Sequence, residues 1–214
     1  FLPLYIQTLG HFNAWQLNLL SGTAFAITFL AKAIASPFWG KLADQYGRKP
    51  MCLRASLGMT ITITLCGLAP NVWFLIVVRG IQGCFSGYIN NANAIIAASV
   101  PVEKSGKAMG TLATGNVVGT LLGPLLGGVL AGMFGYRASF FVTATMMFVT
   151  FLLTLFFVHE AFTPVTKAEM VPTKQVFSQM AYPRLIWGLF ITTMVIQAAN
   201  MSITSFISLL VASM

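Results

Sequence analysis

The sequence predicts an all-α integral membrane protein, and three observations support this prediction. Of its 214 residues, 57% are hydrophobic and 7% are charged, whereas soluble domains carry about a quarter charged residues. The mean hydropathy is +0.83. Apolar runs follow one another along the chain, each of about 20 residues, the length that a helix needs to cross a bilayer. Membrane strands would instead alternate over about ten residues.

Short polar segments divide the chain into predicted spans. Residues 1–9 are expected to end a first membrane helix, and residues 10–16 to form a turn at the membrane interface. Further spans are expected at 17–38, 51–69, 73–98, 108–132, 138–158 and 184–214. Pro70 and Asn71 separate two of them, because this pair breaks helices and favours turns. We expect a piece cut at both ends, since the chain starts without a methionine and stops inside an apolar run.

Basic residues gather on one predicted face of the membrane. That face holds the loops at 40–50, 99–107 and 159–183, with Lys41, Arg48, Lys49, Arg54, Lys104, Lys107, Lys167, Lys174 and Arg184. Arg137 alone falls at a loop on the other face. By the positive-inside rule, the first face is cytoplasmic. The net charge of +8 therefore marks membrane topology, and nucleic acid is not expected as a partner.

The densest run of charge lies between two spans, at residues 40–49. Two glycines there provide the conformational freedom for a sharp turn. The run resembles the signature between helices 2 and 3 of the major facilitator superfamily, which it matches at Gly40, Leu42, Ala43, Asp44, Gly47, Arg48 and Lys49. The resemblance covers essentially the whole chain, and it implies part of a twelve-helix transporter. Residues 1–158 are then the N-terminal six-helix half, residues 159–183 the cytoplasmic central loop and residues 184–214 the start of the C-terminal half.

The same resemblance implies a conformational latch made of Gly40, Asp44, Gly47, Arg48 and Lys49. Asp44 would reach a helix end in the C-terminal half that this chain lacks, because a carboxylate is stabilised at a positive helix terminus. The alternative is a solvated loop that only sets the topology.

A second copy of this pattern follows 87 to 88 residues later. The run Pro37-Phe38-Trp39-Gly40 recurs as Pro124-Leu125-Leu126-Gly127, and Tyr46-Gly47-Arg48 recurs as Phe134-Gly135, with Arg137 close behind. Three spans separate the copies, so they fall on opposite faces. This is what an inverted repeat of three plus three spans requires, an architecture already known for the superfamily. Two helix ends that look alike by chance are the alternative.

Polar residues form a stripe in the fourth span. Arg79, Gln82, Ser86, Asn90 and Asn93 are spaced 3, 4, 4 and 3, so they share one helix face. An arginine at this depth is too costly to face lipid, and it is expected to face protein or a cavity. Residues 79–83 resemble the superfamily's R-x-x-q-G motif, whose arginine is associated with proton coupling. A purely structural role, tying helices together, is the alternative.

Two other spans carry candidate cavity residues. Thr193, Gln197, Asn200, Thr204 and Ser208 share a face of the last span. They are expected either to line a cavity or to bind neighbouring helices. In the second span Lys32 shares a face with three hydroxyl residues. It either points inward or extends to the cytoplasmic surface.

Glycines recur every fourth residue in the fifth span. The set is Gly115, Gly119, Gly123, Pro124, Gly127 and Gly128. Small residues in a column allow another helix to approach closely, and this packing alone would explain them. The pattern also resembles the antiporter signature of the superfamily's drug exporters, which favours efflux over uptake.

The sequence therefore predicts a multidrug exporter in the plasma (inner) membrane, and segments 36–40, 91–97 and 104–112 resemble bacterial multidrug exporters. It would move small amphipathic, drug-like molecules by alternating access, with the proton gradient as the energy source and no cofactor or metal. The acidic residues Asp44, Glu103, Glu160 and Glu169 all fall in predicted loops, so proton coupling follows from the resemblance alone. An importer or facilitator of a small polar solute is the alternative. An enzyme is not expected, because His11 and His159 lie on opposite sides of the membrane.

Overall fold

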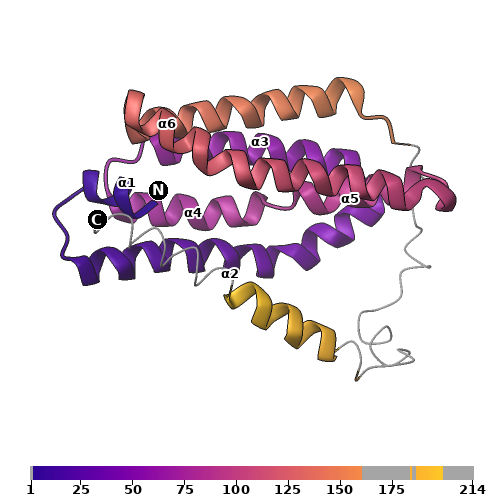
Figure 1. The fold of residues 1–214 in the computed structure, drawn as a ribbon, viewed down its shortest axis with the longest axis horizontal. Coiled ribbons are helices and arrows are strands. Elements are labelled where there is room, and N and C mark those ends of the chain that lie inside the picture. The colour runs from indigo at the N-terminus through magenta and orange to yellow at the C-terminus, as the bar shows by residue number, and fades with distance from the viewer. Residues whose placement is uncertain (1, 161–183, 185–186, 200–214) are drawn as a thin grey trace. The chain divides into compact units, whose positions relative to one another are not determined.

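The computed structural model describes residues 2–160, 184 and 187–199, and it divides the chain into two units, Phe1–Pro164 and Val165–Met214. The helices of the first unit are α1 (Leu2–Thr8), α2 (Ala14–Tyr46), α3 (Arg48–Gly67), α4 (Val72–Phe85), α5 (Tyr88–Ser99) and α6 (Val102–Phe157) (Figure 1). The second unit contains an apolar helix over Trp187–Ala199. Every regular element among these residues is a helix, as expected.

Three stretches are long and apolar enough to cross a membrane: Ala14–Tyr46, Val72–Ser99 and Val102–Phe157. The last has 56 residues, which would extend about 84 Å if straight and is far too long for one crossing. Gly135 divides it, because its φ of 83° is not helical. The chain turns back there, so α6 is a hairpin of two helices (Figure 1).

The predicted loop at 40–50 is wrong. Helix α2 continues through the charged run to Tyr46, and α3 begins at Arg48, so Gly47 alone makes the turn with φ 95°. The predicted loop at 99–107 is also too long, because α6 already begins at Val102. Charged side chains at a membrane surface are compatible with helical backbone, so charge marks where a helix leaves the membrane and not where it ends.

The two glycine turns confirm the inverted repeat at the level of the backbone. Gly47 has φ 95° and ψ 164°, and Gly135, 88 residues later, has φ 83° and ψ 164°. The α2–α3 hairpin and the α6 hairpin therefore use the same turn. Since three membrane crossings separate them, they lie at opposite ends of the bundle.

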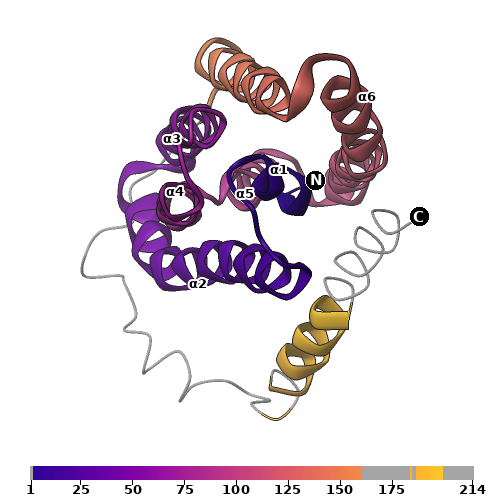
Figure 2. The ribbon, with the colours of Figure 1, turned by 90° about the vertical axis from the view of Figure 1, so that its left-hand side faces the viewer.

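The fourth span is not the single helix that its sequence predicts. It consists of α4, which ends at Phe85, and α5, which begins at Tyr88. Gly87 between them has φ 121°, a conformation that favours glycine. Figure 2 shows α5 displaced from the axis of α4. Asn71 opens α4, as the predicted turn required, and its Oδ1 accepts a 2.8 Å hydrogen bond from the Phe74 amide.

Close packing fixes α4 against its neighbours. A Cβ added to Gly83 would collide with the Thr28 carbonyl oxygen of α2, and one added to Gly58 of α3 would collide with the Phe85 ring. Small residues at such contacts are typical of membrane helices, where backbones approach closely. The end of α4 is therefore held tightly between α2 and α3.

The turn conformation can be tested at Gly135. Gly135→Ala is expected to lower the free energy of unfolding by about 1–3 kcal/mol, because φ 83° with ψ 164° is a region that only glycine adopts readily. Gly132→Ala is the matched control, since it lies three residues earlier in the same helix with nothing within 4 Å of the added Cβ. Thermal unfolding of the full-length protein in detergent measures both. Equal stability of the two variants would contradict the assignment of this turn.

Candidate functional site

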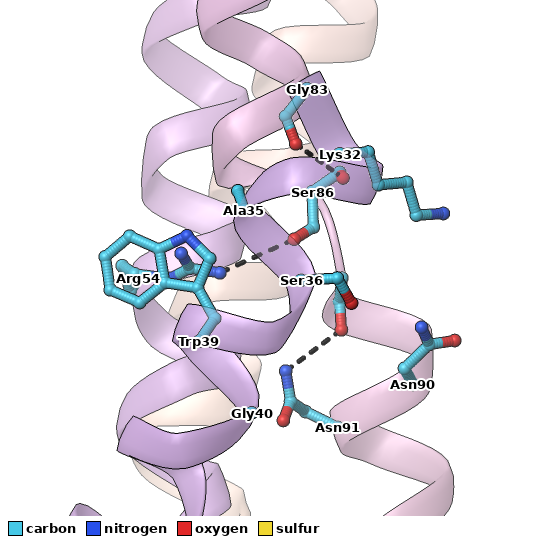
Figure 3. A pocket seen from close by; sticks show the side chains of 11 residues that line it. Lys32, Ala35, Ser36, Trp39, Gly40, Arg54, Gly83, Ser86, Asn90 and Asn91 are labelled. Atoms are coloured by element: carbon cyan, nitrogen blue, oxygen red, sulfur yellow. Dashed lines mark hydrogen bonds between the residues drawn. The ribbon is translucent and has the colours of Figure 1, made fainter. Parts of the chain in front are cut away.

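A small pocket lies at the break between α4 and α5 (Figure 3). Its volume is about 100 Å³, whereas sites for drug-sized ligands span roughly 300–1,000 Å³. The pocket is therefore large enough for a polar group or a few waters, and it can form only part of a site for a larger molecule. It is lined by Lys32, Ala35, Ser36, Trp39, Gly40, Arg54, Gly83, Ser86, Gly87, Asn90 and Asn91.

The pocket lining is polar and positively charged. Its two charged residues, Lys32 and Arg54, are both cations, and no acidic residue lines it. Asn91 Nδ2 donates to the Gly87 carbonyl at 3.0 Å. Lys32 and Asn90 hydrogen-bond to no other side chain among the described residues, so their polar groups are available to a guest. Helix breaks that expose such groups at membrane depth are typical of transporter binding sites.

Arg54 contacts both neighbouring helices from the pocket. Its Nη1 donates to the Cys84 carbonyl at 3.4 Å and its Nη2 to the Ser86 carbonyl at 3.5 Å. Its guanidinium carbon also lies 3.6 Å from the centroid of the Trp39 ring. Sequence reasoning placed Arg54 only among the loop cations. Its position three residues after the start of the predicted span at 51–69 was the signal that could have identified it.

The structure divides the predicted stripe of the fourth span. Ser86 and Asn90 line the pocket, together with Lys32 from α2. Arg79 and Gln82 lie earlier in the chain, within α4, and Arg79 Nη1 donates to Gln82 Oε1 at 3.3 Å. The stripe was predicted for one continuous helix, and the break between α4 and α5 interrupts that helix.

The remaining predicted cavity residues lie elsewhere. Asn93, on α5, is half-buried and does not line the pocket. Gln197 belongs to the helix of the second unit, and Asn200 lies outside the described residues.

A second cluster lies at the N-terminus of α3. Both carboxylate oxygens of Glu160, just beyond α6, accept from the Arg48 amide at 3.0 and 2.9 Å, and Oε2 accepts from the Lys49 amide at 2.7 Å. Lys49 Nζ in turn donates to the Leu155 carbonyl near the end of α6 at 3.0 Å. A carboxylate thus lies at the positive end of one helix and an ammonium at the negative end of the other, and both contacts are favourable.

The predicted latch residues do not form one group, and only Arg48 and Lys49 contact Glu160 in this cluster. Asp44 Oδ1 lies 3.8 Å from Arg48 Nη2, and their side chains are 53% and 36% exposed. A pair this exposed contributes only about 0–1 kcal/mol. Gly40 lines the pocket, and Gly47 makes the turn. Sequence reasoning missed Glu160 as a site residue, although a carboxylate directly after an apolar span was the available signal.

The glycine column lies on the first half of α6. A Cβ at Gly115, Gly119, Gly123, Gly127 or Gly128 would meet no atom of the described chain within 4 Å outside the helix's own backbone. The helix continues through Pro124. The predicted close approach of another helix to this column stays a prediction.

Comparison with known proteins assigns the chain to a family of transporters. The family described as Major Facilitator Superfamily matches residues 1–214. The chain is 52% identical to Multidrug resistance protein MdtG of Proteus mirabilis (strain HI4320) over 209 residues, 98% of this chain and 52% of that protein. It is 50% identical to the protein of the same name from Rahnella sp. (strain Y9602) over 99% of this chain and 51% of the relative. The chain spans about half the length of the curated relatives it matches.

The Glu160 cap can be tested by hydrogen exchange. Glu160→Gln is expected to speed exchange of the Arg48 and Lys49 amides about tenfold, because charged hydrogen bonds are stronger than neutral ones. Glu103→Gln, in the exposed first turn of α6, is the matched control. Exchange is followed by mass spectrometry on the full-length protein in detergent. Unchanged exchange at the start of α3, or an equal effect of both variants, would show that Glu160 does not cap α3.

Proposed function

Since this chain belongs to the major facilitator superfamily, we propose that the full-length protein is a secondary transporter that exports amphipathic, drug-like molecules by alternating access. Its spans identify it as an integral membrane protein, and we place it in the plasma (inner) membrane. The segments around Gly47, Val100 and Glu160 then face the cytoplasm, in keeping with the positive-inside rule. The C-terminal half would complete the transport pathway.

The observation that carries this proposal is the polar pocket at a break in the middle of a membrane span. Transporters of this kind bind substrate near the bilayer midplane, where helices are discontinuous. The neutral donors and acceptors Ser36, Ser86, Asn90 and Asn91 suit tolerant recognition of varied molecules. The identity of about 50% to relatives named as multidrug resistance proteins supports export of drugs over other cargo.

We propose that Arg79 takes part in proton coupling. It lies on a membrane-spanning helix with the neutral Gln82 as its hydrogen-bond partner, and its Nε is buried with no partner among the described residues. A cation whose hydrogen bonds are incomplete can change partners when a nearby group gains or loses a proton. The matching R-x-x-q-G motif supports the same role.

A facilitator or importer of a small polar solute is the second candidate. The pocket favours it in one respect, because about 100 Å³ suits a small polar group. A facilitator would need no proton gradient, which gives the two proposals opposite outcomes in one experiment.

Dye efflux from energised vesicles carrying the full-length protein tests the proposal. Efflux of a fluorescent cationic dye is expected to stop when an uncoupler is added. Arg79→Ala is expected to lower the initial rate about tenfold, because a charged hydrogen-bond donor is lost at membrane depth. Lys107→Ala, with an exposed side chain at the start of α6, is the control. Efflux that persists under the uncoupler and in Arg79→Ala would remove the coupling assignment and favour the facilitator.

A further inference from the structure

The break in the fourth span leaves backbone groups without helical partners in the middle of a candidate membrane span. Helix α4 has 14 residues and α5 has 12, within a candidate span of 28. The carbonyls at the end of α4 therefore lie far from both ends of the span. Such groups must be satisfied inside the protein, because an unpaired carbonyl in hydrocarbon is costly.

Arg54 satisfies two of these carbonyls from a neighbouring helix. It reaches from α3 to the Cys84 carbonyl. Figure 3 shows its hydrogen bond to the Ser86 carbonyl and its guanidinium against the Trp39 ring of α2. A planar guanidinium can donate to two acceptors and present its face to an aromatic ring at the same time, whereas an ammonium cannot. The end of α4 is thereby tied to both α2 and α3.

The start of α5 contacts both α3 and α6. The Tyr88 and Thr154 hydroxyls share a 2.8 Å hydrogen bond, which ties α5 to the second half of α6, and Cys52 Sγ of α3 lies 3.9 Å from the Tyr88 carbonyl oxygen. Gly87, with φ 121°, is the joint between the two half-helices. Both half-helices thus pack against α3, and one glycine connects them.

We infer that Arg54 is a positioning residue that fixes the end of α4 to α2 and α3, so that bending of the span during the transport cycle is confined to Gly87. This inference rests on the proposed transport function, whereas the contacts of Arg54 do not depend on that function. Because the pocket opens at this joint, movement of α5 would change its shape. Loss of Arg54 would let the end of α4 move as well, and the pocket would no longer change shape at one defined joint.

The natural cysteines report on this joint. Cys84 is half-buried beside Arg54, whereas Cys66 is 1% exposed near the far end of α3. Alkylation by N-ethylmaleimide, resolved by peptide mass spectrometry on the full-length protein in membranes, measures both thiols. Arg54→Gln is expected to raise the rate at Cys84 about tenfold and to leave Cys66 unchanged, since two hydrogen bonds from a charged donor are lost. Arg54→Lys is expected to give a smaller rise, because it keeps the charge.

Arg137→Gln is the matched control at the other end of α3. Arg137 Nη2 donates to the Ala69 carbonyl at 3.3 Å, so its loss is expected to expose Cys66 and not Cys84. If Arg54→Gln does not accumulate in membranes, Gly87→Ala is measured together with Arg54→Lys in its place. Gly87→Ala strains the joint directly, because φ 121° disfavours any side chain. An unchanged rate at Cys84, or an equal rise at Cys84 and Cys66 in the Arg54 variants, overturns the inference.

Transport kinetics separate this role from substrate binding. Arg54→Lys is expected to lower the maximal efflux rate several-fold and to change the half-saturating substrate concentration less than about twofold, because a positioning residue acts on the conformational step. A change confined to the half-saturating concentration would make Arg54 a substrate contact and overturn the inference. If the unmodified protein exports no dye, the proposed function fails, and the alkylation rates still decide whether Arg54 holds the joint.

Discussion

Each place where a membrane helix ends or breaks leaves backbone groups without helical partners, and this constraint explains the contacts of α3. Its first amides are capped by Glu160. At its other end, the Cys66 carbonyl accepts from the Tyr5 hydroxyl at 2.9 Å and the Ala69 carbonyl accepts from Arg137. Each partner comes from α1, from α6 or from the residues just beyond α6, so the same hydrogen bonds that satisfy α3 also assemble the bundle.

The inverted repeat extends from the turns to the contacts made across them. Lys49 lies two residues after Gly47, and Arg137 lies two residues after Gly135. Lys49 of α3 donates to the Leu155 carbonyl near the end of α6, and Arg137 of α6 donates to the Ala69 carbonyl just beyond α3. Each cation near the start of one helix thus binds a carbonyl near the end of the other, as a two-fold axis that relates the two hairpins requires. The sequence repeat had placed Arg137 only close behind Gly135, and the backbone alignment of the two glycines pairs it with Lys49.

Composition and the length of the apolar runs were sufficient to predict the helices, since hydrocarbon leaves few alternatives for a spanning chain. They could not locate the break at Gly87, because a glycine inside an apolar run is equally compatible with a continuous membrane helix. For the same reason the stripe from Arg79 to Asn93 was drawn as one face. The contacts of Arg54 and Glu160 join residues about 30 and 110 positions apart, and local periodicity carries no information on such pairs.

The two arginines near the fourth span differ in the number of contacts they make, and this difference suits different roles. Arg54 donates to two carbonyls and stacks on an indole, so every state in which it is displaced loses several contacts at once. Arg79 has one neutral side-chain partner, and the Nε of each arginine is buried without a partner among the described residues. A cation held by several contacts fixes a structure, whereas a cation with one side-chain partner can exchange it at lower cost. The contacts therefore favour Arg54 as the fixed point and Arg79 as the cation that responds to a changing charge nearby.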